Sequence, residues 1–239
     1  MQGYVHSFES LAAVDGAGLR YGIFFVGCPL RCAYCHNPDT WNAKGTPYTA
    51  EELLNKIIRY VPYFKETGGV TFSGGEPLLQ AEFLKELTEL LRPRNIRYVV
   101  DTSGSAPLTQ AAKQVLKGAQ AVLLDVKFAS EKEYQAYAGG SISPVMETLR
   151  FLEEENVPTV VRTVVVPHVN DSKERLAPYV ELVRGFTCVK EYELLAFHTM
   201  GFQKYEKLGI PNPLAGTPAL PPERLTELQA FVNGKLKGE

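Results

Sequence analysis

The sequence lacks an excess of charge of either sign, and it lacks long apolar runs. Its 239 residues carry 25 lysines and arginines against 27 aspartates and glutamates, a formal net charge of −2. Proteins that bind nucleic acid or membrane surfaces without sequence specificity carry a basic excess, so the balance argues against both classes. No apolar run approaches the roughly 20 residues of a membrane-spanning helix, and the start of the chain shows no signal peptide. We therefore expect a cytoplasmic protein that binds neither nucleic acid nor a membrane.

Cysteine is also scarce, and its distribution is uneven. Of four cysteines, Cys28, Cys32 and Cys35 lie within eight residues, and Cys188 stands alone far along the chain. A tight triplet with one distant cysteine is a poor disulfide framework in a reducing compartment. The triplet instead indicates a metal site.

The sequence does contain a regular alternation of short apolar runs with segments whose apolar residues have helical spacing. The overall composition, 45% hydrophobic and 22% charged, is that of a globular protein and not of a disordered one. Short apolar runs predict strands at residues 21–26, 70–72, 96–100, 121–124, 160–166 and 192–196, with a further strand at 3–8. Apolar residues at helical spacing predict helices at 50–60, 81–91, 109–117, 145–155, 173–184 and 222–235.

This alternation predicts an α/β fold with a mainly parallel sheet. Six main strands are fewer than the eight of a closed barrel, so the candidates are a partial barrel and an open doubly wound sheet. No internal repeat or linker divides the chain, and residues 209–222 are expected to form a long surface loop. We expect one domain over residues 1–239.

Polar residues follow every expected strand. The cysteine loop follows the first strand, and the others are followed by stretches at 73–77, 101–104, 125–127 and 168–171 and by His198. Ligands of parallel α/β sheets bind at the carboxyl ends of the strands. These stretches are therefore expected to form one site.

The triplet has the spacing C-x3-C-x2-C, which suits a soft metal or an iron–sulfur cluster. A cubane cluster takes four thiolates, so three would leave one iron open for another ligand. The alternative is a structural zinc ion, with His36 or Cys188 as its fourth ligand. Adjacent side chains seldom bind one small ion together, which makes Cys35 with His36 an awkward pair.

Two further groups accompany the cysteines. Gly74 and Gly75 at a strand end permit close backbone approach, and the site beside an open iron would take the amino-acid end of a cofactor. Asp101 and Asp125 end adjacent strands, so their carboxylates are expected to converge unless both are solvated surface acids.

The remaining histidines and the distant cysteine have less context. His198 is either a site residue or an interior histidine, and His6 and His168 are expected to be structural. Cys188 is expected to be a buried, unreactive thiol.

Taken together, these motifs resemble a known family. The cysteine triplet with Tyr34 before its last cysteine resembles the radical S-adenosylmethionine (SAM) superfamily signature. Nearly the whole chain resembles the enzymes that activate glycyl radical enzymes, through the motifs at residues 14–20, 34–41, 69–78, 101–104, 124–127 and 192–198.

The resemblance implies a partial (β/α)6 barrel that holds a [4Fe-4S] cluster on Cys28, Cys32 and Cys35, with SAM on the open iron. It implies that SAM is bound by Tyr34, Cys35, His36, Gly74, Gly75, Glu76, Asp125, Val126, Lys127 and His198. A monovalent cation, sodium or potassium, would be held by Asp101, Thr102, Asp125 and the carbonyl of Leu123. Asp15, His36 and Arg162 match positions beside the substrate glycine.

The implied activity is reductive cleavage of SAM, followed by removal of a hydrogen atom from a backbone glycine of a partner enzyme. A flavodoxin or ferredoxin would supply the electron, and the chain would act as a monomer. The sequence departs from the family pattern at Ala17, Pro77 and Ser103, none of which removes a side-chain ligand. The lack of a second cysteine cluster favours the members that act on pyruvate formate-lyase. Another radical SAM activity and a non-enzymatic zinc module are the alternatives.

Overall fold

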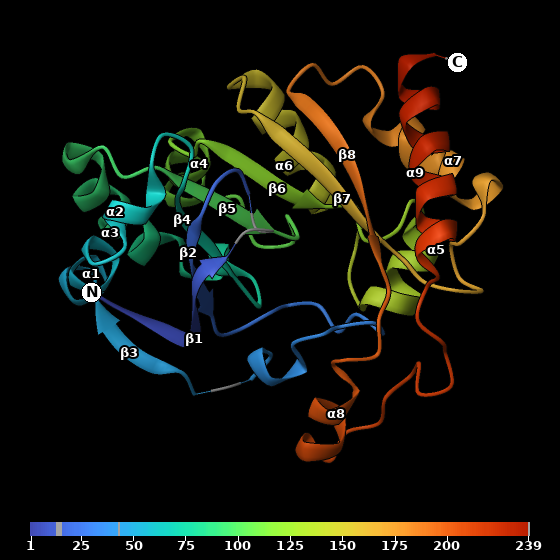
Figure 1. Cartoon of the computed structure of the whole chain (residues 1–239), viewed down its shortest axis with the longest axis horizontal. Coiled ribbons are helices and arrows are strands. Elements are labelled where there is room, and N and C mark those ends of the chain that lie inside the picture. The colour runs from blue at the N-terminus through green and yellow to red at the C-terminus, as the bar shows by residue number, and fades with distance from the viewer. Residues whose placement is uncertain (13–15, 43, 239) are drawn as a thin grey trace.

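The computed structural model describes residues 1–12, 16–42 and 44–238, and its strands form one mixed sheet (Figure 1). The strands are β1 (Gln2–Ala12), β2 (Arg20–Phe25), β3 (Thr46–Thr49), β4 (Gly69–Gly74), β5 (Tyr98–Thr102), β6 (Ala121–Asp125), β7 (Thr159–Val165) and β8 (Val189–Ala196). Their order across the sheet is β3-β1-β2-β4-β5-β6-β7-β8.

Strands β2 and β4 to β8 run parallel to one another, each paired with the next in the sheet. With the helices between them they form the partial (β/α)6 barrel that the family resemblance implies. Strand β1 confirms the strand expected at residues 3–8, and it pairs antiparallel with β2. Strand β3, which the sequence analysis does not predict, pairs antiparallel with β1 at the edge of the sheet. It is short and contains Pro47, which is typical of an edge strand because proline cannot donate a hydrogen bond.

The helices are α1 (Ala50–Ile58), α2 (Val61–Phe64), α3 (Ala81–Leu91), α4 (Gln110–Lys117), α5 (Glu131–Glu133), α6 (Ser143–Glu154), α7 (Lys173–Val183), α8 (Phe202–Leu208) and α9 (Pro222–Lys237). Short 3-10 turns lie at η1 (Pro38–Thr40), η2 (Pro77–Gln80) and η3 (Arg92–Arg94), and η4 (Tyr134–Ala138) is a π-helix. The six helices expected from apolar spacing are confirmed, with ends that differ by one or two residues. Among the described residues, no helix is long and apolar enough to cross a membrane.

Helix α1 illustrates how the sequence sets these elements. The Thr49 hydroxyl accepts a hydrogen bond from the Glu52 amide at 3.2 Å, and the Glu52 carboxylate accepts one from the Thr49 amide at 2.7 Å. This capping box fixes the start of the helix. Leu53, Leu54 and Ile57 then fall on one face and are buried.

One strand boundary differs from the prediction in a way that matters for the site. Strand β5 begins at Tyr98, because Asn95 adopts a left-handed conformation (φ 53°) and turns the chain before Ile96. The strand extends to Thr102, so Asp101 lies within it. Asp125 is likewise the last residue of β6, so both acids are held by sheet hydrogen bonds.

Helix α9 covers the last edge of the sheet. Helix α9 lies beside β8 (Figure 1), and its Gln229 side chain accepts from the Leu194 amide and donates to the Tyr192 carbonyl, both at 2.7 Å. This side chain occupies backbone N–H and C=O groups of the edge strand that would otherwise be open for pairing.

After β8 the chain leaves the sheet through α8, stands apart from the barrel, and returns to α9. The surface loop expected at residues 209–222 is confirmed as the return path.

Candidate active site

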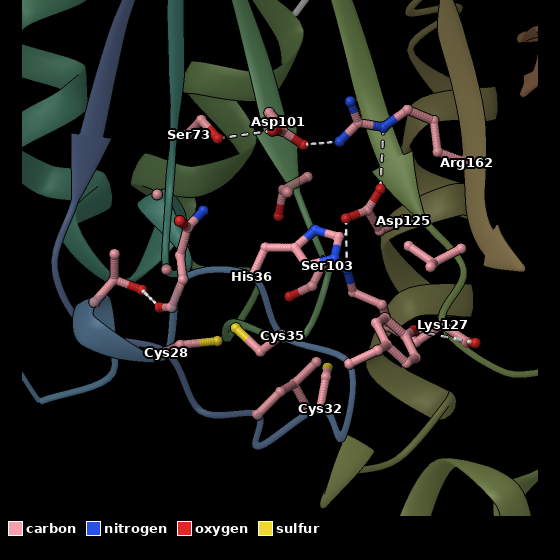
Figure 2. Close-up of a pocket in the computed structure, with 18 of the residues that line it drawn as sticks. Cys28, Cys32, Cys35, His36, Ser73, Asp101, Ser103, Asp125, Lys127 and Arg162 are labelled. Atoms are coloured by element: carbon pink, nitrogen blue, oxygen red, sulfur yellow. Dashed lines mark hydrogen bonds and ion pairs between the residues drawn. The ribbon is translucent and has the colours of Figure 1, made fainter. Parts of the chain in front are cut away.

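The carboxyl ends of the parallel strands surround a pocket of about 220 Å³. Figure 2 shows the three cysteines at one end of this pocket and a chain of charged side chains at the other. The residues expected in the site that line it are Cys28, Cys32, Tyr34, Cys35, His36, Gly74, Gly75, Asp101, Thr102, Asp125, Lys127 and Arg162. Segments far apart in sequence meet here because parallel strands end at the same edge of the sheet.

The cysteine loop is held from outside by backbone hydrogen bonds to η4. The Arg31 and Ala33 amides donate to the carbonyls of Ala138 and Tyr137, each at 2.7 Å. A single π-helical turn of this kind is frequent at functional sites. The π-helix thus sets the path of the loop on both sides of Cys32.

Burial keeps the three thiols protonated. It raises the pKa of Cys28 to about 11 and that of Cys32 to about 12, and it also raises the pKa of Cys35. Protonated thiols are poor nucleophiles at neutral pH. A metal centre that displaces their protons converts them to ligands, so the loop suits coordination and not nucleophilic catalysis.

The thiols do not suit a single metal ion. Within residues 1–12, 16–42 and 44–238, no three histidine, cysteine, aspartate or glutamate side chains are placed to hold one. Cys188 precedes β8 at the opposite end of the sheet, where its carbonyl accepts from the Thr159 amide. It is buried, as expected, and cannot be a fourth ligand with the triplet. A cubane cluster fits better, since its thiolates bind different iron atoms and need not converge on one point.

Glycine is required at positions 74 and 75 because the backbone there lies against the end of β2 and against Gly27. Gly74 has φ +117°, and a Cβ there would lie 2.3 Å from the Phe25 amide nitrogen. A Cβ on Gly75 would lie 2.1 Å from the Gly27 carbonyl oxygen. The close backbone approach expected of this pair is therefore made to the chain itself, which leaves both glycines in the pocket wall.

The Glu76 side chain, expected from the sequence to bind the cofactor, is not among those that line the pocket. It is fully buried, and its carboxylate accepts hydrogen bonds from the Leu78 amide at 3.1 Å, the Thr102 hydroxyl at 2.7 Å and the Ser103 amide at 2.9 Å. The Ser103 hydroxyl also donates to it. Glu76 therefore joins the exit of β4 to the exit of β5, and it does so from behind the pocket.

We expect Glu76→Ala to lower the free energy of unfolding by about 3 kcal/mol or more, because several buried donors lose their acceptor at once. Urea denaturation of the metal-free protein measures this change. Glu82→Ala, at an exposed position of α3, is the control and should change stability by no more than about 0.5 kcal/mol. Equal stability of the two variants would show that the hydrogen bonds of Glu76 are not needed.

A chain of alternating charges crosses the other end of the pocket (Figure 2). Arg162 on β7 pairs with Asp101 through Nη2 and with Asp125 through Nε at 3.1 Å. Lys127 Nζ lies 2.5 Å from the second carboxyl oxygen of Asp125. Ser73, whose position at a strand exit is the only sequence signal for it, donates to Asp101 at 2.7 Å. The register of β6 and β7, which sets Asp125 opposite Arg162, makes this arrangement possible.

These pairings decide the charge of the buried groups. Burial acts to raise the pKa of Asp125, but Lys127 and Arg162 outweigh it and hold the pKa below the usual value. Burial acts to lower the pKa of Lys127, and Asp125 together with Cys32 raises it well above the usual value. Asp125 and Lys127 are therefore both charged at neutral pH.

Among the expected cation ligands, Asp101, Asp125 and Thr102 already have partners within the chain. The guanidinium of Arg162 lies between Asp101 and Asp125, so a side chain already supplies the positive charge there. The Thr102 hydroxyl donates to Glu76. Leu123, whose carbonyl is the remaining expected ligand, is not among the residues that line the pocket.

His36 and His198 stack on each other with ring centroids 3.7 Å apart. His36 lines the pocket, and His198 lies behind it and does not. Burial, with the neighbouring His198, lowers the pKa of His36 to about 4, so the ring is neutral. Nδ1 of His198 is buried and has no hydrogen-bond partner among the described residues.

The other expected residues are placed as follows. Val126 is fully buried outside the pocket wall, and Asp15 lies outside the described residues. His6 is not part of the pocket, and its Nε2 lies 3.3 Å from the Asp39 carboxylate. His168 is also outside it, at a left-handed turn with φ 66°.

Sequence reasoning does not find the residues of α8 that hold the cysteine loop. The Tyr205 hydroxyl donates to the Cys35 carbonyl at 3.1 Å. Lys204 Nζ lies 2.7 Å from the Asn37 side-chain oxygen and 3.0 Å from Asp39. No motif marks these residues, because their role depends on a contact between segments about 170 residues apart.

Comparison with known proteins agrees with the family resemblance of the sequence motifs. The model of the radical SAM superfamily matches residues 23–178, more than half of the chain. A pyruvate formate-lyase-activating enzyme of Clostridium pasteurianum is 40% identical, over 99% of this chain and 100% of the relative. One of Staphylococcus epidermidis (strain ATCC 12228 / FDA PCI 1200) is 36% identical, over 98% of this chain and 96% of the relative.

Solved structures share the fold. Streptococcus suis SuiB bound to its precursor peptide SuiA has a TM-score of 0.68 at 13% identity, covering 88% of this chain and 44% of that one. A domain of a pyruvate-formate lyase-activating enzyme from Bacteroides vulgatus ATCC 8482 has a TM-score of 0.56 at 20% identity, covering 70% and 93%. The matched cysteine loop, the partial barrel and the extent of the sequence identity agree: this chain belongs to the radical SAM superfamily and, within it, to the family of the pyruvate formate-lyase-activating enzymes.

Proposed function

We propose that this chain activates pyruvate formate-lyase, a glycyl radical enzyme, by reductive cleavage of SAM and removal of a hydrogen atom from a backbone glycine of that partner. The observation that carries the proposal is the pocket at the strand ends. It brings three protonated thiols, a glycine-lined strand exit and a chain of buried charges into one wall. The near-full-length identity to relatives named for this activity supports the choice of partner.

The residues present fit the cofactors of the superfamily, a [4Fe-4S] cluster and SAM. Cys28, Cys32 and Cys35 would hold the cluster, and the wall at Gly74 and Gly75 would receive the amino-acid end of SAM. When bound, these cofactors supply a carbon-centred radical that removes the hydrogen atom. The protein contributes position and exclusion of water.

Individual side chains have more specific tasks in this proposal. Lys127 is a cation held in place by Asp125, and it would face the SAM carboxylate. Arg162, held by the same carboxylate, is kept as a candidate beside the substrate glycine. Neutral His36 and the Tyr34 ring, buried under the loop, give the site flat, uncharged surfaces. Glu76 is a positioning residue, since it contacts the pocket only through Thr102 and Ser103. Asp15 is retained as a candidate beside the substrate glycine.

We also propose that a monovalent cation, sodium or potassium, binds at Asp101, Thr102, Asp125 and the Leu123 carbonyl when the site is loaded. Two carboxylates on adjacent strands support this, because they are a favourable setting for a hard cation. Arg162 must then move from between them. We further propose that the chain acts as a cytoplasmic monomer with one domain over residues 1–239, and that a flavodoxin or ferredoxin reduces it.

The activity is tested with the anaerobically reconstituted protein, SAM, a photoreductant and purified pyruvate formate-lyase. We expect low-temperature electron paramagnetic resonance (EPR) to show a glycyl radical on the partner and chromatography to show released methionine. Pyruvate formate-lyase in which alanine replaces the acceptor glycine is the control and should show no radical. Cleavage of SAM without a radical on pyruvate formate-lyase, but with one on another glycyl radical enzyme, would show that the partner is wrong.

A further inference from the structure

A second hollow borders the cysteine loop. It is a groove of about 680 Å³ between the loop and the segment that contains α8. Its wall includes Cys32 and Trp41 from the loop, with Tyr205, Leu208, Ile210 and Pro211 from the other side. We call it the outer groove.

Cys32 and Trp41 line both the outer groove and the active-site pocket. The pocket contains the groups that the proposed function assigns to SAM and to the substrate glycine. An electron donor therefore cannot use the pocket while both are bound. The outer groove gives a separate approach to the same cysteine.

The surface of the outer groove is apolar and aromatic. The rings of Trp41 and Tyr205 meet edge to face with centroids 6.1 Å apart. Leu208, at the end of α8, is 45% exposed, which is unusual for a leucine beside a buried cysteine. Flat aromatic and proline surfaces of this kind suit the edge of a planar ring system.

The rim of the groove carries positive charge without a matching acid. Arg31 is exposed, and its guanidinium lies 5.0 Å from the Trp41 ring centroid. It donates to two backbone carbonyls and to Asn42, and it pairs with no carboxylate among the described residues. Asp39 does line the groove, but its carboxylate is paired with Lys204 at 3.0 Å. An acidic partner surface is therefore complementary to this rim.

We propose that the outer groove is the docking site of the electron donor, a small acidic protein that carries a flavin at its surface. This inference rests on the proposed function. The three cysteines would hold the cluster that accepts one electron from the reduced flavin of the donor, a transfer in which no bond forms or breaks. The apolar walls contact the ring edge, and Arg31 faces the acidic surface around it.

Leu208→Glu tests the proposal, because it places a negative charge in the groove without touching the pocket. Reduced flavodoxin is the probe, and loss of the oxidised cluster is followed by absorbance and EPR. We expect the second-order rate of reduction by flavodoxin to fall about tenfold or more, as for a central interface residue. Reduction by deazaflavin and light, which needs no docking site, should stay within about twofold of the unsubstituted protein.

Ile58→Glu is the matched control, since Ile58 is 42% exposed and lies on α1, away from the groove. It should leave both rates unchanged. An unaltered flavodoxin rate in Leu208→Glu would overturn the docking site. So would loss of reduction by both reductants, because the substitution would then act on the cysteine loop itself.

Two further outcomes separate this inference from the function on which it rests. If Leu208→Glu slows a reduced ferredoxin but not flavodoxin, the assignment to a flavin protein is overturned. If the unsubstituted protein is reduced by flavodoxin but cleaves no SAM, the proposed function fails while the docking site stands.

Discussion

Cys32→Ala is expected to abolish both cluster assembly and SAM cleavage while leaving the protein folded. Two thiols cannot replace three in a site that already leaves one iron open. Cys32 is buried but small, so the substitution itself should cost only about 1 kcal/mol of stability. Iron analysis, the absorbance of the reconstituted protein and methionine release measure the effect, and circular dichroism checks the fold.

Cys188→Ala is the matched control for this prediction. Cys188 is also buried, 3% exposed against 7% for Cys32, but it lies at the opposite end of the sheet. We expect this variant to bind iron normally and to cleave SAM at a rate within about twofold of the unsubstituted protein. If it loses iron as well, the assignment of the cluster to three cysteines is wrong.

Arg162→Leu is expected to lower the free energy of unfolding of the metal-free protein by about 3 kcal/mol. The substitution leaves Asp101 and Asp125 near each other without the cation that lies between them. Since the two carboxyl groups keep some contact with solvent, the lower end of the range for broken buried pairs applies. Thermal or urea denaturation measures the loss. Arg150→Leu, at an exposed position of α6, is the control and should change stability by about 0.5 kcal/mol or less.

The same variant tests the cation site separately. Potassium or sodium chloride should restore part of the lost stability of Arg162→Leu, because the cation can bind where the guanidinium was. Choline chloride at equal ionic strength controls for screening. Equal recovery in all three salts would contradict a specific cation site at these carboxylates.

Most of the fold was predictable because its signals are local. Helix α1 follows from its capping residues and the apolar spacing of Leu53, Leu54 and Ile57. The strands that the sequence predicts are runs of branched and aromatic residues, which is typical of strands buried on both faces of a parallel sheet. Strand β3 and helix α8 were missed, because one is a four-residue edge strand and the other is a short helix stabilised by contacts with the cysteine loop.

The sequence by itself determined the fold class, the strand exits at which the site would form, and the cysteine triplet that marks the superfamily. These depend on residue type and spacing along the chain. Only the tertiary structure decided that the buried Glu76 carboxylate joins two strand exits, that Arg162 lies between two carboxylates and that Cys32 borders a second groove. Each of these depends on strand register or on contacts between distant segments, and spacing along the chain carries no information about where a side chain finds its partner.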